Sequence, residues 1–215
     1  MPAPRKFTHQ QLQAAALELI DQEGLAGLTM RALAARLGTG PMTIYNYVDG
    51  REGLERLVTG AVMAQARWSD EPSGDWRTRL AATAEAIWRA VRAHPNAIPL
   101  VLTTRSLDEE ALAPAEALLQ ALADSGRTGA ELLAAFRVVS GFIAGFAQAE
   151  LTGPLASAAG QDAGTIVARM ADLPAQRFPR LIEIARAATG DPQTEFRAGL
   201  GILLAGIDAS GPHPD

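Results

Sequence analysis

Residues 24 to 54 read GLAGLTMRALAARLGTGPMTIYNYVDGREGL, which places two short helical patterns on either side of a glycine-containing turn. Thr29 has the side chain of a helix cap, and an apolar stripe at helical spacing follows it. Gly38 to Gly40 ends that pattern. Pro41 suits the first turn of a second helix, which we expect to reach Val48. Two short helices joined in this way predict a helix-turn-helix motif.

A supporting helix flanks the motif on each side. The first should end before Gly24, because apolar residues at helical spacing stop there. A longer helix is expected to run from Arg51 toward Trp68, with an apolar face that would link the motif to the rest of the chain. The expected capping boxes at the starts of these helices are Thr8 with Gln11 and Asp49 with Glu52.

The remaining sequence predicts an all-α protein without strands, because helix formers dominate and β-branched or aromatic residues rarely cluster. The break SDEPSGD after Trp68 suggests a DNA-binding domain at 1–67 and a larger ligand-binding and dimerisation domain at 68–215. The expected helices of the second domain lie at about 75–94, 97–103, 108–124, 128–152, 162–172 and 177–189, with a loop at 153–164. A last helix starts at Asp191 and Pro192.

Composition narrows the class of protein. The chain has 215 residues, 48% of them hydrophobic, which can fill a real core. It contains no cysteine, so disulfides, thiolate metal sites and thiol nucleophiles are excluded. The N-terminus lacks the apolar stretch of a signal peptide, and we expect no run to approach the ~20 apolar residues of a membrane span. We therefore expect a cytoplasmic protein that does not enter a membrane.

Charge is distributed unevenly along the chain. The net charge is −5, yet residues 1–67 contain seven Lys or Arg against six Asp or Glu, which gives +1. Residues 68–215 therefore carry −6. An acidic body with an arginine-studded end is compatible with one face that docks on phosphates.

The second helix of the motif offers a polar and aromatic surface. Ile44 and Val48 occupy inward positions, which leaves other faces for Thr43, Tyr45, Asn46 and Tyr47. Threonine and tyrosine hydroxyls hydrogen-bond phosphates, and an asparagine amide can pair with adenine. Arg51 adds charge for phosphate, and Arg31 could reach guanine or the backbone. The alternative is that the tyrosines only cover seams between small helices.

Residues 24 to 54 resemble the signature of the TetR family of bacterial repressors. The shared residues, in ungapped order, are Gly24, Thr29, Arg31, Leu33, Ala34, Leu37, Gly38, Thr43, Ile44, Tyr45, Val48, Arg51 and Leu54. The resemblance implies a repressor that binds a palindromic operator as a dimer and is released by a small-molecule effector. It also implies backbone contacts from Thr43, Tyr45 and Tyr47, a phosphate contact from Arg51 and a base contact from Arg31.

The sequence departs from tetracycline repressors at several positions. Pro41 and Met42 stand where those proteins present Gln then Pro, and Asn46 replaces a bulky aromatic residue. Residues 75–95 and 136–150 resemble the ligand-binding half of tetracycline-repressor-type members, but Val101 falls at the position of their metal-ligating histidine. The resemblance therefore implies neither tetracycline–magnesium sensing nor any metal or cofactor, and the operator sequence stays open.

Dimerisation and ligand sensing should involve the later helices. Small residues that permit close helix approach occur at Gly141, Gly145, Gly199 and Gly206, and family members pair these two helices between subunits; packing within the chain is the alternative. The candidate effector pocket comprises Trp88, Val101, Arg105, Phe142, Phe146, Gln148 and Met170. These side chains could instead be ordinary core. His94, just before Pro95, suits the end of a helix dipole.

Other functions find little support. The chain has no G-x-S-x-G elbow, H-E-x-x-H, P-loop or dinucleotide fingerprint, so an all-helical enzyme is the weaker alternative and we expect no catalytic activity. A ligand-responsive activator, or a helix-turn-helix used only for protein contacts, is also compatible with the residues. Repression follows from the resemblance alone.

Overall fold

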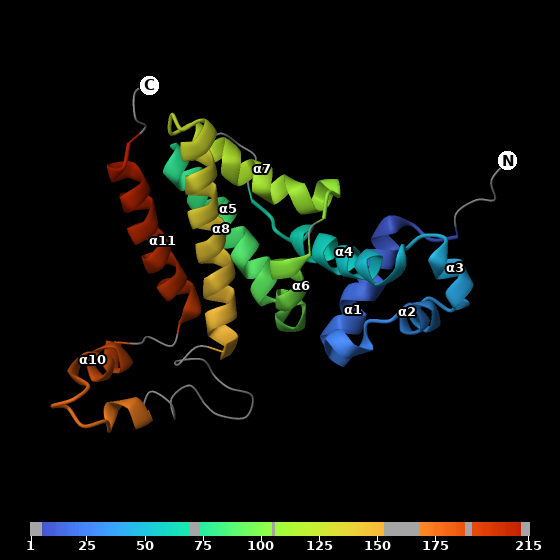
Figure 1. Cartoon of the computed structure of the whole chain (residues 1–215), viewed down its shortest axis with the longest axis horizontal. Helices are drawn as coiled ribbons and strands as arrows, with labels where there is room; N and C mark the ends of the chain where they lie inside the picture. The colour runs from blue at the N-terminus through green and yellow to red at the C-terminus, as the bar shows by residue number, and fades with distance from the viewer. Residues whose placement is uncertain (1–5, 69–73, 105, 153–167, 188–190, 212–215) are drawn as a thin grey trace. The chain divides into compact units, whose positions relative to one another are not determined.

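The computed structural model of the chain describes residues 6–68, 74–104, 106–152, 168–187 and 191–211 (Figure 1). These residues form helices, turns and short connections, and no strand occurs among them, so the all-α prediction is confirmed. The chain divides into two compact units, residues 1–124 and 125–215. The sequence-based boundary at 67/68 concerns functional domains and stays a prediction.

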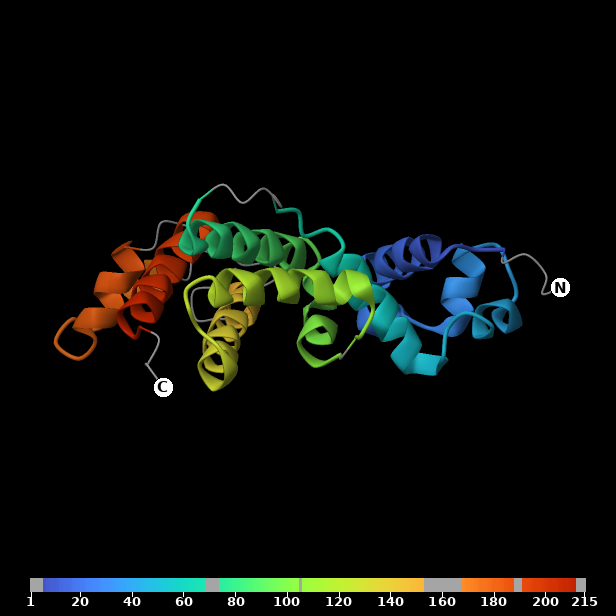
Figure 2. The same ribbon diagram turned by 90° about the horizontal axis from the view of Figure 1, so that it is seen from above.

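The first unit is arranged around α4, Gly50–Met63, which contacts α1, α2, α5, α6 and α7. Its fully buried apolar residues include Val58 and Val62. Figure 2 shows α5 and α7 side by side. The other elements of this unit are α1 His9–Gly27, α2 Met30–Arg36, α3 Pro41–Tyr45, α5 Trp76–Arg92, the 3₁₀ turn η1 Pro95–Ala97, α6 Ile98–Thr103 and α7 Glu109–Ala123.

Capping residues start the first two helices as predicted. The Thr8 hydroxyl accepts a hydrogen bond from the Gln11 amide at 3.1 Å, and the Gln11 side chain accepts one from the Thr8 amide at 2.8 Å. Thr29 likewise accepts from the Ala32 amide at 3.1 Å. Gly24 marks the expected end of regular α1, because its φ of 69° leaves the right-handed region that a helix requires.

Two local predictions are wrong around α3. The helix ends at Tyr45, where a reach to Val48 was expected, because Asn46 and Tyr47 donate i→i−3 hydrogen bonds that tighten the chain into a turn. Asp49 precedes α4 but its side chain makes no capping hydrogen bond. Its ψ of 85° is far from the extended 150–160° seen at Thr8 and Thr29, so the carboxylate does not reach the amides of the first turn.

A polar clasp joins the end of α5 to α1 and α4. Nδ1 of His94 lies 2.8 Å from Oδ2 of Asp21, and its Nε2 lies 3.0 Å from Oε1 of Gln65. The Asn96 amide donates to the carbonyl oxygens of Ile20 and Asp21, at 3.1 and 3.2 Å. The histidine therefore bonds specific side chains of α1 and of the turn after α4, a role beyond the helix-dipole contact predicted for it.

The second unit contains two long helices that run side by side, α8 Gly129–Thr152 and α11 Pro192–Ala209 (Figure 1). Phe142, Phe146 and Phe196 form a cluster between them, with ring centroids 5.2 to 5.7 Å apart. A β-carbon at Gly199 would lie 2.9 Å from two atoms of the Phe142 ring. The close helix approach predicted at Gly199 thus occurs within the chain.

The rest of this unit is shorter. Arg127, which is buried, donates to the carbonyl oxygen of Ile207 and to the Ser210 hydroxyl, and so closes the C-terminal end of α11. Helix α10 spans Pro179–Ala187, inside the predicted 177–189. Residues 168–171 are helical. The earlier part of the helix predicted at 162–172, and the predicted loop 153–164, lie outside the described residues.

Much of α8 and α11 is apolar and exposed. Val138 on α8 is 52% exposed and Ile202 on α11 is 77% exposed. By length and composition, Gly129–Glu150 would suffice to cross a bilayer, and only 22% of its most apolar part is buried within the chain. The expectation that no stretch of this kind exists is therefore wrong for α8. One such helix is weak evidence for a membrane, because helices of soluble proteins can pass the same test of length and composition.

Candidate nucleic-acid interface

The surface of α3 has the two sides that the sequence predicts. Ile44 is fully buried and Val48, in the turn that follows, is 3% exposed. Tyr45 is 55% exposed, Asn46 is exposed and Thr43 is half-buried. Two inward apolar residues hold the segment against the helices beneath it, so its polar and aromatic side chains remain available to a partner.

A hollow of about 650 Å³ lies beside α3, where the starts of α2 and α4 meet it. Its lining includes the apolar residues Leu28, Met30 and Leu54. Arg31, Tyr45 and Arg51 also line it, so three of the predicted DNA-binding residues share one concave surface. The helix-turn-helix packing brings them together from three different helices.

Arg51 is engaged within the protein. Its Nε forms an ion pair with Oε1 of Glu55 at 2.7 Å. Its Nη1 donates to the Leu28 carbonyl at 2.7 Å, and its Nη2 donates to that of Leu25 at 3.3 Å. These bonds fasten the start of α4 to the end of α1 and to Leu28, which follows it. A phosphate contact by the same guanidinium stays a prediction.

Tyr47 meets the residues that precede α1. Its hydroxyl oxygen accepts hydrogen bonds from the amides of Lys6, at 2.7 Å, and Phe7, at 3.3 Å. The two aromatic rings meet edge to face, with centroids 6.1 Å apart. Sequence reasoning missed this contact. Its signal was an aromatic residue just before the Thr8 cap, the position at which an apolar side chain often fixes the chain entering a helix.

Most arginines of the helices α1 to α4 are neutralised locally. Arg36 pairs with Glu18 at 3.2 Å, Arg51 with Glu55, and Arg56 with Glu52 at 3.8 Å. Arg31 and Lys6 occur in none of the ion pairs between described residues. Arg31 lines the same hollow as Tyr45, and the main-chain amide of Lys6 bonds Tyr47, so two cations of residues 6–63 that form no ion pair among the described residues lie near α3.

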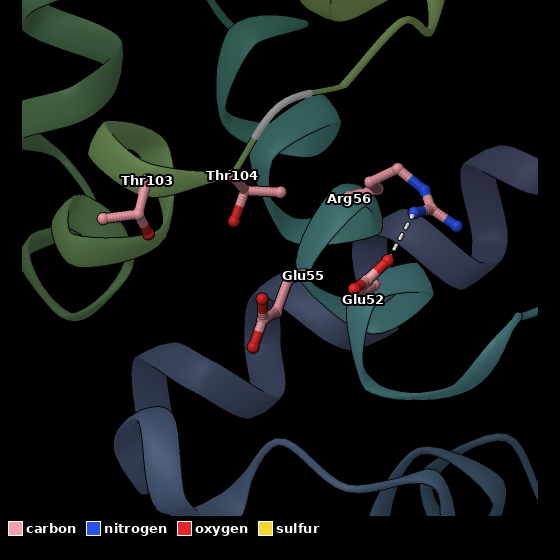
Figure 3. Close-up of a pocket in the computed structure, with 5 residues that line it drawn as sticks. All are labelled: Glu52, Glu55, Arg56, Thr103 and Thr104. Carbon is pink, nitrogen blue, oxygen red and sulfur yellow. Dashed lines mark ion pairs between the residues drawn. The ribbon is translucent and has the colours of Figure 1, made fainter.

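A second, polar hollow of about 300 Å³ lies between α4 and the end of α6. Figure 3 shows Glu52, Glu55 and Arg56 on α4, with Thr103 and Thr104 across from them. Glu55 is also the ion-pair partner of Arg51. The end of α6 therefore lies near the Glu55 carboxylate, which orients Arg51, one of the predicted DNA-binding residues.

The predicted effector-pocket residues fall in both compact units. Trp88 is fully buried on α5 and Val101 is half-buried on α6, both in the first unit. The second unit contains Phe142, Phe146, Gln148 and Met170, all half-buried. The two phenylalanines are in contact, and Arg105 lies outside the described residues. A single pocket built from all of these residues stays a prediction.

Two protein-family models match the chain. Residues 12–56 match the model described as bacterial regulatory proteins, tetR family. Residues 69–210 match the model of the tetracyclin repressor-like C-terminal domain. The first match covers the helices around the α3 surface, and the second covers most of the remaining chain.

Individual relatives agree with these models. An HTH-type transcriptional regulator of Saccharopolyspora erythraea is 32% identical over 95% of this chain and 86% of its own length. The class A tetracycline repressor of Escherichia coli is 27% identical over 90% of this chain and 87% of its own. Among solved structures, ActR of Streptomyces coelicolor in complex with actinorhodin has a TM-score of 0.79 at 25% identity, over 97% of this chain and 98% of its own.

Proposed function

The chain belongs to the TetR family of bacterial regulatory proteins and is a transcriptional regulator, and from this premise we propose that it is a cytoplasmic repressor that a small molecule releases from its operator. The observation that carries the proposal is the α3 surface: Tyr45 and Asn46 are exposed, Arg31 lines the same hollow as Tyr45, and buried Ile44 and Val48 hold the segment in place. Residues 1–67 would bind DNA, and residues 68–215 would bind the effector and dimerise. We propose no catalytic activity.

The proposed contacts with DNA divide by chemistry. Asn46 and Arg31 are assigned to base edges, because their side chains can form bidentate hydrogen bonds with adenine and guanine. Thr43, Tyr45 and Tyr47 are assigned to the phosphate backbone through their hydroxyls. Arg51 would contact the DNA backbone through the N–H groups that are not used in its bonds within the protein. Its larger contribution would be to hold α4 in place.

A homodimer is proposed because helix-turn-helix regulators bind paired half-sites. We propose that the exposed apolar faces of α8 and α11 pack against the same two helices of a second copy. Gly141, Gly145 and Gly206 support this, because a β-carbon at each would meet nothing within 4 Å, so another helix can approach closely. Burial of Val138 and Ile202 in the same interface would remove apolar surface from water.

The proposed effector is a small molecule contacted by aromatic side chains. ActR, the solved relative, binds actinorhodin. The corresponding half of this chain supplies Trp88, Phe142 and Phe146, and we propose Val101, Arg105, Gln148 and Met170 as further contacts. Few polar groups in a mainly apolar pocket are typical of small-molecule sites.

Helix α4 is the proposed route from effector to DNA. It contacts α5, α6 and α7, so a shift of these helices would displace it. It also begins with the Arg51 bonds that position the end of α1 and Leu28. A displacement of α4 would therefore change the separation of the two α3 surfaces in a dimer, with a coupling of about 1–3 kcal/mol.

Selection from random duplexes tests DNA binding directly. We expect an enriched palindrome whose affinity falls steeply with salt, because phosphate contacts release counterions. Enrichment of no duplex would overturn the proposal.

A reporter driven by a promoter that contains the selected site separates repression from activation: expression should fall when the protein is present, and a rise would show an activator. Fluorescence polarisation of the labelled site, screened against small molecules, should then identify a releasing compound.

A further inference from the structure

We propose that residues 6–8, which immediately precede α1, form an arm on the DNA-binding face, with Tyr47 as its anchor and Lys6 as an additional phosphate contact. This inference rests on the proposed DNA-binding function and adds a group to its interface. Lys6 is the only lysine of the chain, and the α3 surface assigned above does not include it.

The anchor is a convergent arrangement of two amides and one ring. The amides of Lys6 and Phe7 both donate to the hydroxyl oxygen of Tyr47, which is 41 and 40 residues later in the sequence. The edge-to-face contact of Phe7 with the Tyr47 ring adds an apolar component to the same attachment. Three contacts to one side chain fix the direction in which the chain enters α1, and they fix Lys6 beside the turn that follows α3.

The two tyrosines divide the α3 surface between them. Residues two apart differ by about 200° around the axis of an α-helix and by about 240° in a 3₁₀ turn, so Tyr45 at the end of α3 and Tyr47 in the turn after it face different sides. Tyr45 and Arg31 line the same hollow, whereas Tyr47 accepts a hydrogen bond from the main-chain amide of Lys6. A cation therefore accompanies each tyrosine. A DNA backbone that lies along α3 would meet Arg31 at one side and Lys6 at the other.

Charge makes Lys6 important for this interface. Arg36, Arg51 and Arg56 are each paired with a glutamate, so little of their positive charge acts on a distant phosphate. Lys6 is exposed, and its ammonium lies 5.3 Å from the centre of the Phe7 ring in a cation–π contact. Its position and charge are those of a backbone contact.

The test is the salt dependence of operator binding by the full-length protein, using the duplex selected above. Lys6→Ala should reduce the slope of log K against log salt by about 0.9 for each subunit on DNA, or about 1.8 for a dimer. Lys6→Arg should keep the wild-type slope. Arg186→Ala, which removes an exposed cation from α10 in the other compact unit, is the matched control and should also keep it.

Tyr47→Phe tests the anchor, because it keeps the ring and removes the acceptor oxygen. Its slope should fall toward that of Lys6→Ala, and the double variant should fall no further than Lys6→Ala alone. An unchanged slope in Lys6→Ala would overturn the arm, and fully additive effects in the double variant would overturn the anchoring role of Tyr47. If the wild-type protein selects no duplex, the proposed function itself is wrong, which is a different result from either of these.

Discussion

The guanidinium of Arg51 donates a hydrogen bond from Nη1 to the main-chain carbonyl oxygen of Leu28 at 2.7 Å. Leu28 follows α1 and is fully buried, and Arg51 lies in the first turn of α4. Glu55, one turn along α4, holds the guanidinium in this orientation. A residue expected at the phosphate backbone therefore has a defined structural role in the packing of the first four helices.

Arg51→Ala should lower the free energy of unfolding by about 1–2 kcal/mol, because it leaves the Leu28 carbonyl without its charged donor. Urea unfolding measures the change. Arg56→Ala is the matched control on the same helix: its pair with Glu52 is exposed, so the effect should stay within about 0.5 kcal/mol. Equal stability of the two variants would show that the bond to Leu28 contributes no more stability than the Arg56–Glu52 ion pair, which contradicts the structural role of Arg51.

Arg31→Ala should weaken operator binding by about 1–3 kcal/mol, roughly 5- to 150-fold, because Arg31 is exposed beside Tyr45 and can meet a base edge. Fluorescence polarisation gives the affinity, and repeated selection should show relaxed preference at one base pair of each half-site. Arg36→Ala removes the same charge from α2, but Arg36 is bonded to Glu18 and Gln22 on α1. Its operator affinity should change little; a loss as large as that of Arg31→Ala would mean that net charge alone matters.

Ile202→Asp should dissociate the proposed dimer, because it places a charge where α11 would meet a second copy. Light scattering coupled to size exclusion should show the monomer mass of 22.6 kDa for the variant and twice that mass for the wild type. Ile184→Asp on α10, another exposed isoleucine, is the control and should remain dimeric. A monomeric wild type would contradict the assignment of the α8 and α11 faces.

The cap of α11 should be sensitive to acid. The pKa of Asp191 lies below its ordinary value of 3.8, because its carboxylate accepts hydrogen bonds from the Thr194 hydroxyl and from the amides of Gln193 and Thr194. A lowered pKa in the folded state stabilises the protein above pH 3.8, and this stabilisation is lost as the pH falls through the folded-state value.

Asp191→Asn should therefore be less stable than wild type near neutral pH, and the difference should shrink below pH 3.8. Chemical unfolding at a series of pH values measures it. Asp172→Asn, which neutralises an exposed carboxylate of the same compact unit outside α11, is the control and should stay within about 0.5 kcal/mol of wild type. A difference between Asp191→Asn and wild type that is constant with pH would contradict the capping explanation.

Local chemistry explains what could be predicted from the sequence. A cap hydroxyl and an apolar stripe act within a few residues, so the starts of α1 and α2 were correct. Asp191 and Pro192 likewise mark the start of α11. The buried positions Ile44 and Val48 follow from helical spacing alone, because one face of a short helix must meet the core.

Contacts between distant residues account for the rest. Nothing near Tyr47 in the sequence indicates that its hydroxyl accepts hydrogen bonds from amides about 40 residues earlier. The early end of α3 depends on the turn that places Tyr47 beside those amides. The bonds from Arg51 to Leu25 and Leu28 are likewise set by how α4 packs on the end of α1. The packing of Phe142 on Gly199 is a property of the helix pair, so a glycine expected at a subunit interface lies against its own chain.

The clasp of His94 and Asn96 on α1 affects how chimeric regulators should be built from this protein. A junction at residue 67 would transplant α1 without the histidine and the amide that bond its Asp21 and its carbonyl oxygens. The foreign sensor would then have to supply matching groups at the same height along α1. A graft that includes everything through Asp124 carries the donor's own clasp, and it makes the exchangeable part of this regulator nearly twice as long as its DNA-binding helices.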